Sequence, residues 1–421
     1  MTTLADAPRA TPSPAEAPSV YSWQTPVVII VCGCLIAMIS FGPRSALGQF
    51  LTPMSIDLHW GRDVFSLALA IQNLLWGAAQ PFAGALADRF GAVRVLSGGA
   101  VVYAVGLWLM ANWTSPGVLD LSAGVLVGLG LAGSSFSLVI GALGKLVPGQ
   151  WRMLAFGAGT AAGSFGQFLY SPLAVGLTGA FGWRSALYTF AVIMLLVLPL
   201  SLALATRGNA PGAGGVQHQS ARQALSEAFG HRSYVLLVLG FFTCGFQLAF
   251  ITTHLPAYLT DRGLTAVDGA WTIAVIGAFN IIGSILAGWF SSRVPKRYIL
   301  SFIYLGRALA IIAFISVPAS STSAILFGAV TGLLWLSTVP PTNGLVVVMF
   351  GTRWLTMLSG AAFFSHQVGG FLGVWLGGEV FIRTGSYDAV WWLAVLFGVL
   401  SAVINLPIVE KPVARLAAQP A

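Results

Sequence analysis

One arginine stands deep inside an apolar stretch near the start of the chain. Arg44 lies about eighteen residues into the stretch 26–51, within Phe41-Gly-Pro-Arg-Ser45. A charged side chain at such depth costs about 2.5–3.5 kcal/mol on insertion scales, so it usually faces a polar cavity. Its planar fork donates two parallel hydrogen bonds, which suits a carboxylate. We therefore predict that Arg44 binds an anion; the alternative is an arginine that reaches the outer headgroups.

Two further ionisable side chains lie at a similar depth. Arg307 is nine residues into the stretch 298–318, and His366 is in the middle of 354–381. Arg307 is a candidate second contact for the anion, or a partner for a helix end. His366 is a candidate proton-coupling group because histidine changes charge near neutral pH; the alternative is a neutral core histidine. No acid lies in the middle of any apolar stretch, which favours an anionic ligand.

Uncharged polar side chains complete the candidate site. Each either contacts the substrate or bonds between helices. Trp76 and Trp335 are candidates for an apolar wall beside an aromatic or branched substrate, although packing is the more usual role. We predict substrate contacts from Gln167, Tyr170, Gln247, Asn280 and Asn343, while Gln72, Asn73 and Thr342 share their depth.

No sequence pattern points to catalysis. The chain contains no phosphate-binding loop, metal-ligand cluster or nucleophile–base pair. Gly128-Leu-Gly-Leu-Ala-Gly133 has the spacing of a dinucleotide fingerprint, but no strand precedes it. We therefore predict no cofactor, no bound metal and no enzymatic activity.

The composition indicates a membrane protein. The chain has 421 residues, of which 57% are hydrophobic and 8% charged, and its mean hydropathy is +0.86. A soluble domain carries about 25% charged residues. The composition therefore excludes a cytosolic enzyme and a disordered chain. The net charge of +8 comes from Lys and Arg scattered singly, which argues against a nucleic-acid partner.

Twelve apolar stretches can be counted. Backbone groups in lipid need internal partners, and continuous apolar runs differ from the alternation of a barrel strand. The predicted fold class is therefore an all-α membrane protein with twelve transmembrane helices. The stretches are 26–51, 64–86, 95–112, 118–142, 153–180, 184–206, 233–259, 269–291, 298–318, 322–350, 354–381 and 387–409.

The distribution of basic residues predicts the orientation. With the N-terminus inside, most of the 20 Lys and Arg fall in cytoplasmic segments. Cytoplasmic loops carry such an excess. We therefore predict that both termini are cytoplasmic and that the chain lies in the cytoplasmic (inner) membrane of a bacterium.

The two halves of the chain repeat at an offset of about 204 residues. Duplicated units of this kind are a basis for alternating access, with the substrate held between the halves. Three matches share the offset, namely Gly84-Ala-Leu-Ala-Asp-Arg89 with Gly288-Trp-Phe-Ser-Ser-Arg293, Gly166 with Gly369, and Gly182 with Gly385.

The repeat predicts two pseudo-symmetric six-helix bundles. A Gly/Pro-rich stretch followed by a polar, weakly amphipathic piece separates them, as expected of a linker. The predicted segments are a disordered cytoplasmic tail 1–25, a first bundle 26–206, a cytoplasmic linker 207–232, a second bundle 233–409 and a cytoplasmic tail 410–421.

The loop after the second predicted helix carries a family signature. Gly84, Asp88, Arg89, Gly91 and Arg94 are spaced so that glycines allow a tight turn and three charges form a network. This segment resembles the signature of the major facilitator superfamily of transporters. The resemblance covers essentially the whole chain and implies the major facilitator fold. It also implies that these five residues form a conformational loop motif, with Asp88 facing the N-terminal end of helix 11.

Two segments resemble the monocarboxylate porter family more specifically. Gly42-Pro-Arg-Ser45 is similar to a helix 1 motif that places a lysine in the cavity, and Arg152-Met-Leu-Ala-Phe-Gly157 is similar to a helix 5 motif. The resemblance implies a bacterial relative of that family. The family's Asp and Arg in helix 8 are replaced by Asn280 and Ser284, so its proton-coupling pair does not carry over.

We therefore expect a secondary transporter, active as a monomer in the lipid bilayer. It would move a small organic anion, a monocarboxylate, together with a proton. The alternatives are a carboxylate exchanger that uses a counter-anion, a drug/proton exporter, and a non-transporting sensor. An exporter usually places an acid at membrane depth, and a sensor would carry an additional soluble domain or long tail.

Overall fold

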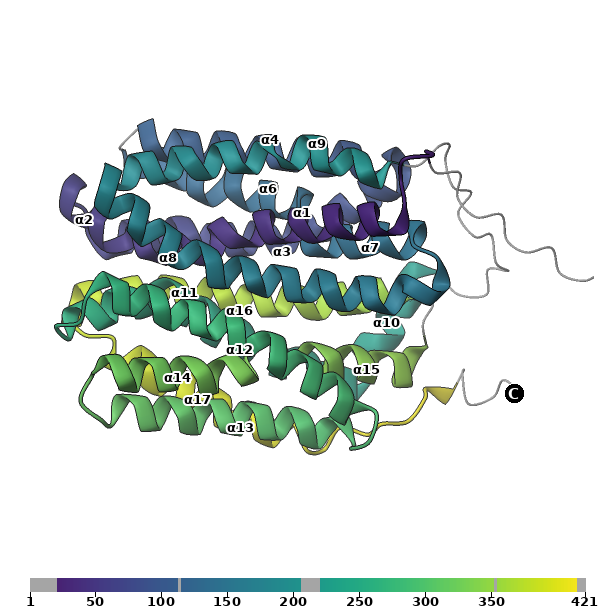
Figure 1. Ribbon diagram of the computed structural model, residues 1–421. Helices are drawn as coiled ribbons and strands as arrows, with labels where there is room; N and C mark the ends of the chain where they lie inside the picture. Colours follow the sequence, from purple (N-terminus) through teal and green to yellow (C-terminus); the bar gives the residue numbers. More distant parts are fainter. Residues whose placement is uncertain (1–20, 113–114, 206–219, 352–353, 415–421) are drawn as a thin grey trace, which may run out of the picture.

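The structure is a computed structural model that describes residues 21–112, 115–205, 220–351 and 354–414. Within these ranges all regular structure is helical. The first half of the chain lies above the second half in Figure 1. It comprises α1 (Pro26–Ala46), α2 (Leu51–Leu58), α3 (Arg62–Phe90), α4 (Ala92–Asn112), α5 (Pro116–Leu119), α6 (Val127–Gly133), α7 (Phe136–Leu146), α8 (Gly149–Leu195) and α9 (Val197–Ser201).

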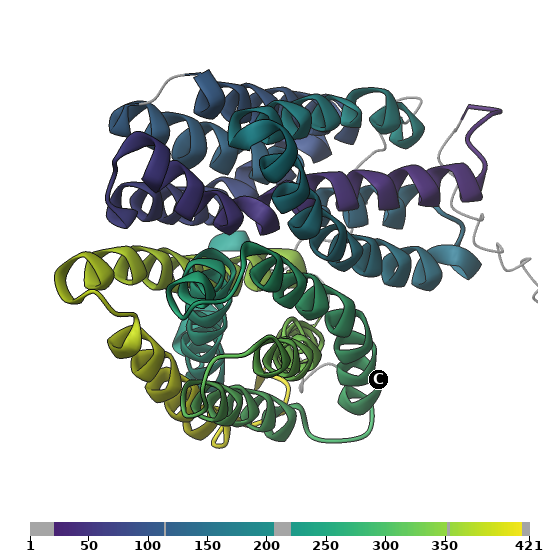
Figure 2. The same cartoon turned by 60° about the vertical axis from the view of Figure 1, so that its left-hand side comes forward.

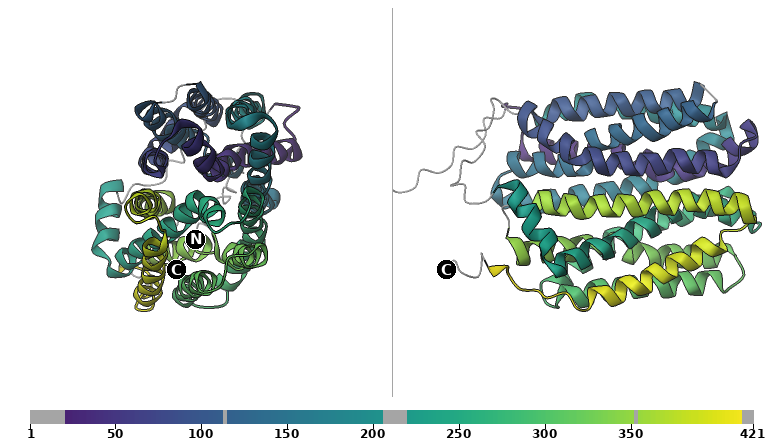
Figure 3. Two further views of the ribbon diagram at one scale, coloured as in Figure 1. Left: turned by 90° about the vertical axis from the view of Figure 1, so that its left-hand side faces the viewer. Right: turned by 180° about the vertical axis from the view of Figure 1, so that it is seen from behind.

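The second half forms a separate group of helices in Figure 2 and in the end-on view of Figure 3. A short amphipathic helix, α10, precedes it at the end of the bundle where both described chain ends lie. The helices are α10 (Ala221–Gly230), α11 (Arg232–Asp261), α12 (Ala266–Ser291), α13 (Lys296–Ile315), α14 (Ser321–Leu334), α15 (Val339–Phe350), α16 (Leu355–Thr384) and α17 (Asp388–Asn405).

Nine helical stretches in the described ranges are long and apolar enough to cross a membrane. One of them, Gly157–Leu204, is 48 residues long and is broken at Gly182, so it has the length of two passes. The helices α3 and α16 are 29 and 30 residues long and lie in the interior. If Gly157–Leu204 is counted as two passes and α3 and α16 as one pass each, the described helices are consistent with the twelve passes that the sequence predicts.

The repeat has a counterpart in the packing of the helices. A Cβ atom at Gly166 would overlap the carbonyl oxygen of Met38 on α1, and one at Gly369 would overlap that of Phe242 on α11. Each glycine therefore lets a pair of helices approach closely. The other matched pair, Gly182 and Gly385, has positive φ angles of 83° and 70° in the two halves.

The buried apolar side chains form two clusters. One extends from Ile29 to Leu204 and includes three residues of the second half, and the other extends from Ala228 to Val413. Each half therefore has its own core. The exact segment boundaries remain predictions from the sequence.

The two halves contact each other mainly through α3 against α16 and α8 against α12. Five polar contacts between the halves lie at mid-bundle or at the end opposite the chain ends. We call that end, which carries Arg62, the far end. The contacts are Arg62–Asp261, Arg62–Tyr387, Gln167–Ile273, Asn280–Ser164 and Gln367–Asn73.

Candidate functional site

Arg44 lies in the last turn of α1, directly after Pro43. The Arg44 side chain is only partly exposed, and its Nη2 donates a hydrogen bond of 2.6 Å to Oδ1 of Asn73 on α3. The guanidinium carbon lies 5.3 Å from the ring centre of Trp76, one turn further along α3. The side chain is therefore held against a neighbouring helix, in a position unlike that of an arginine extending to the headgroups.

Arg44 has spare donors and no acidic partner. None of the ion pairs among the described residues involves it. Its Nε is buried without a hydrogen-bond partner. A buried donor that makes no hydrogen bond is costly, and a guanidinium offers five N–H groups. The arrangement can therefore accept a carboxylate or another planar anion.

Two amides connect Arg44 with the second half. Gln367 on α16 donates from Nε2 to the backbone oxygen of Asn73 (3.2 Å), and its Oε1 lies 3.0 Å from Nδ1 of His366. Because Nε2 is the donor in the first bond, Oε1 accepts in the second and Nδ1 of His366 carries a proton. Gly77 makes this approach possible, since a Cβ there would lie 2.6 Å from Cβ of Gln367.

A row of rings crosses the same region. Trp76 meets Phe363 edge to face at 5.4 Å, Phe363 stacks on His366 at 5.6 Å, and His366 lies 5.0 Å from Phe241. We call Trp76, Phe363, His366 and Phe241 the aromatic row. The indole nitrogen of Trp76 donates to Gln80 (3.1 Å), so its polar atom is already satisfied.

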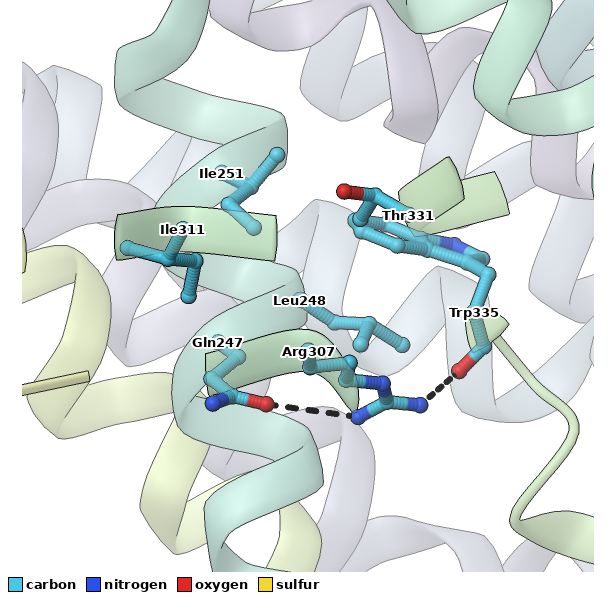
Figure 4. Close-up of a pocket in the computed structure, with 7 residues that line it drawn as sticks. All are labelled: Gln247, Leu248, Ile251, Arg307, Ile311, Thr331 and Trp335. Atoms are coloured by element: carbon cyan, nitrogen blue, oxygen red, sulfur yellow. Dashed lines mark hydrogen bonds between the residues drawn. The ribbon is translucent and has the colours of Figure 1, made fainter. Parts of the chain in front are cut away.

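Arg307 makes a different set of contacts (Figure 4). Its Nε donates to the carbonyl oxygen of Leu334 (2.9 Å), its Nη2 donates to the carbonyl oxygens of Leu334 and Trp335, and its Nη1 lies 3.5 Å from Oε1 of Gln247. Because α14 ends at Leu334, the cation stabilises a helix C-terminus inside the bundle. These contacts match the helix-end role that the sequence offered; substrate binding by Arg307 stays a prediction.

Two predicted contact residues, Gln247 and Gln167, bond between helices. Nε2 of Gln247 donates to the carbonyl oxygen of Ala394 (2.9 Å). Nε2 of Gln167 lies 3.5 Å from the carbonyl oxygen of Ile273. Both glutamines are buried. Their cargo contacts remain predictions.

Asn280 is satisfied at both ends of its amide. Its Nδ2 donates to Ser164 in the first half (2.9 Å), and its Oδ1 accepts from Ser284 (3.1 Å) and from the backbone of Leu336 (3.0 Å). Leu336 lies in the break between α14 and α15. Asn280 thus joins both halves and holds a helix end.

Tyr170 packs against α1 at Gly42, two residues before Arg44, and Asn343 lies on α15. Tyr170 is buried against Phe190, at 5.2 Å between ring centres, and fills the space that Gly42 leaves open. It also lines an apolar groove of about 440 Å³ between α1 and α8. Asn343 is half-buried on α15.

The predicted loop motif joins α3 to α4. Gly91 ends α3 with a φ of 87°, so the turn requires glycine. Arg89 and Arg94 are exposed, and no atom would contact a Cβ at Gly84. The side chain of Asp88 lies outside the described residues, as does that of Arg152, so the contact predicted for Asp88 stays a prediction.

The sequence missed a cluster at the far end. Nη1 and Nη2 of Arg62 on α3 bind the carboxylate of Asp261 on α11 at 2.5 and 2.6 Å. Nη1 also donates to the Tyr387 hydroxyl (3.0 Å), and the guanidinium lies 4.1 Å from the ring of Phe381. The Tyr387 side chain is buried. Nδ1 of His254 lies 3.3 Å from this hydroxyl.

No local signal would have identified this cluster. In the sequence, Arg62 is a single basic residue between two apolar stretches. Its partner Asp261 is 199 residues away, and spacing along the chain does not indicate such a pair.

Comparisons with known proteins agree with the fold. A family model described as the Major Facilitator Superfamily matches residues 33–374. The chain is 29% identical over 402 residues to the uncharacterized MFS-type transporter YcxA of Bacillus subtilis, covering 90% of this chain and 94% of that protein. It is 27% identical over 403 residues to human monocarboxylate transporter 11, covering 91% and 82%.

Solved structures share the architecture. A bacterial homolog of the human lysosomal transporter Spinster, in an inward-facing and unoccupied conformation, superposes with a TM-score of 0.75 at 16% identity, covering 92% of this chain and 97% of that one. A D-xylose-proton symporter gives a TM-score of 0.69 at 16% identity, covering 93% and 99%. The predicted all-α transporter fold is confirmed.

Proposed function

The chain belongs to the major facilitator superfamily of membrane transporters, and we propose that its cargo is a small organic anion, a monocarboxylate. The observation that carries this proposal is that Arg44 is a cation inside the bundle with an unused hydrogen-bond donor. Its guanidinium lies inside the bundle with an unpartnered Nε and no acidic partner among the described residues. A carboxylate would satisfy both the charge and the fork of donors.

The cargo carries one carboxylate rather than two. A dicarboxylate would call for a second cation with free donors, and Arg307 is the other arginine within the spans. Its donors are directed to backbone carbonyls and to Gln247. Several relatives are named monocarboxylate transporters, which supports the same cargo class.

The transport is coupled to a proton, and His366 is the coupling group. Its Nδ1 hydrogen bond to Gln367 leaves Nε2 as the atom that gains a proton. Gln367 also bonds to the backbone of Asn73, and the Asn73 side chain bonds to Arg44, so this chain of contacts supports coupling between the two sites. Exchange against a counter-anion is the second candidate, because the described spans hold no acid near Arg44.

Alternating access supplies the transport cycle. The bundles 26–206 and 233–409 rock about the site, and the loop motif at Gly84 and Asp88 stabilises one of the two states. The protein acts as a monomer in the bacterial inner membrane, with both termini in the cytoplasm.

The test is uptake into proteoliposomes that contain the purified full chain. We expect uptake of labelled lactate or pyruvate to be faster when the pH gradient is directed inward, and Arg44→Gln to abolish it. Arg222→Gln is the matched control, because Arg222 is exposed on α10 and should leave uptake unchanged.

Three outcomes would contradict the proposal. Unchanged carboxylate uptake by Arg44→Gln would remove Arg44 from the site. Acceleration by an internal counter-anion, with no effect of pH, would identify an exchanger. Transport of lipophilic cations alone would identify an exporter.

A further inference from the structure

The aromatic row begins beside Arg44, and its first two rings, Trp76 and Phe363, have no free hydrogen-bond donor for a carboxylate. Trp76 lies under the guanidinium at 5.3 Å, and the next ring, Phe363, belongs to the other half of the molecule. The rings come from α3, α16 and α11, which lie where the two halves meet (Figure 1). A group attached to a carboxylate on Arg44 would therefore lie next to these rings.

Resting on the proposed function, we infer that the preferred cargo is a monocarboxylate that carries an aromatic ring. The carboxylate binds Arg44, and the ring lies against Trp76 and Phe363. Aromatic pairs are favourable at ring separations of 4.5–7 Å, in offset or edge-to-face geometry. Successive separations of 5.4 and 5.6 Å along the row fall in this range, so its surface suits a further ring.

The rings of the aromatic row differ from ordinary core side chains because three of them are partly exposed. Trp76, Phe363 and His366 are each half-buried, although they lie on helices at the centre of the bundle. Phe241, at the end of the row, is 6% exposed and supports His366 from α11. The protein therefore does not fully cover the first three rings, whereas the last one is buried behind His366.

The polar atoms near the row select against a hydrophilic tail. Trp76 donates to Gln80, and Gln80 in turn donates to Ser135 (2.7 Å). Gln367 is occupied by Asn73 and His366. A sugar-like chain of hydroxyl groups would thus find few free partners, whereas a ring needs none.

The test compares two anions that differ only by a ring. Labelled 3-phenyllactate and lactate are bound to the purified full chain, and both dissociation constants are measured. We expect 3-phenyllactate to bind about tenfold more tightly, the size expected of one or two aromatic contacts. Trp76→Leu should reduce this preference to near onefold, and Trp76→Phe should restore most of it.

Trp392→Leu is the matched control. Trp392 is 54% exposed on α17, away from the row, so its replacement should leave both constants unchanged. Equal binding of the two anions by the unaltered protein would overturn the inference and leave the proposed function intact. A Trp76→Leu protein that loses both anions equally would also overturn it. If neither anion binds, or if Arg44→Gln binds both normally, the proposed function itself is wrong.

Discussion

The chemistry of the candidate site depends on how few acceptors Arg44 has. Nη2 of Arg44 donates a hydrogen bond to the side chain of Asn73, and this bond fixes the orientation of the guanidinium. Arg307 differs because backbone carbonyls at a helix end take up its donors. Two arginines at similar depth therefore have different surroundings, which their positions in the sequence do not distinguish.

Asn73 should act as a positioning residue for Arg44. Replacing it with alanine removes a hydrogen bond to a charged group, which is worth about 1.5–3 kcal/mol. We expect Asn73→Ala to raise the KM for the carboxylate by about tenfold or more, with a smaller change in the maximal rate. Asn112→Ala, at the exposed end of α4, is the control for the loss of an asparagine. An unchanged KM would show that Arg44 does not need this orientation.

Arg307 should contribute mainly to stability. Arg307→Met would leave the carbonyls of Leu334 and Trp335 without their charged donor. Lost hydrogen bonds of this kind cost about 1–3 kcal/mol. A thermal unfolding assay in detergent should give a lower Tm, with an unchanged KM in the protein that remains folded. A normal Tm together with a raised KM would instead support the predicted cargo contact.

At the scale of the helices, apolar runs and glycines carried most of the predictable information. The sequence located a break near residue 182 from two adjoining apolar stretches, and Gly182 occupies it. It did not indicate the break between Leu334 and Val339, although the two prolines that follow Val339 are a local signal for one.

The partners in the site could not be predicted in the same way. Asn73 is 29 residues from Arg44 and 294 from Gln367. Periodicity gives the length of a helix, but its rotation about its own axis depends on packing against helices far away in the chain. The sequence therefore predicts which polar residues lie within the spans, but it does not predict which of them bond to one another.

The equivalent glycines Gly166 and Gly369 should be equally intolerant of a larger side chain. In each case a Cβ would overlap a carbonyl oxygen of a neighbouring helix. Overpacking typically costs about 1–3 kcal/mol. We expect Gly166→Val and Gly369→Val each to lower the Tm, whereas Gly176→Val, where no atom lies within 4 Å, should not. Equal Tm values for all three variants would contradict the close approach.

On the scale of the whole molecule, the far end is held by contacts between the halves. The Arg62–Asp261 pair links α3 to α11, and the Arg62 and Asp261 side chains are 13% and 33% exposed. The arrangement therefore has one end closed by an ion pair.

Breaking this ion pair should favour opening of the far end. Partly exposed pairs contribute about 1 kcal/mol or less, so Arg62→Gln should shift the population of states by several-fold. Spin labels placed at the far end on α2 and α11 would report this as an increased fraction of long distances. The control is Arg184→Gln, because Arg184 pairs with Asp57 inside the first half. An unchanged distance distribution would mean that other contacts close this end.

The bond from Gln367 to the backbone of Asn73 has a consequence for hydration. The carbonyl of Asn73 also lies within the hydrogen-bonded backbone of α3. The side-chain amide of Gln367, in contrast, has this carbonyl as its one acceptor among the described residues. When α3 and α16 move apart, the amide becomes a bare donor in a low-dielectric setting, at a cost of about 1–3 kcal/mol. Water molecules can remove that cost by taking the vacated place. Separation of the two helices and wetting of the transport path are therefore one event, and a dry opening at this level would be energetically unfavourable.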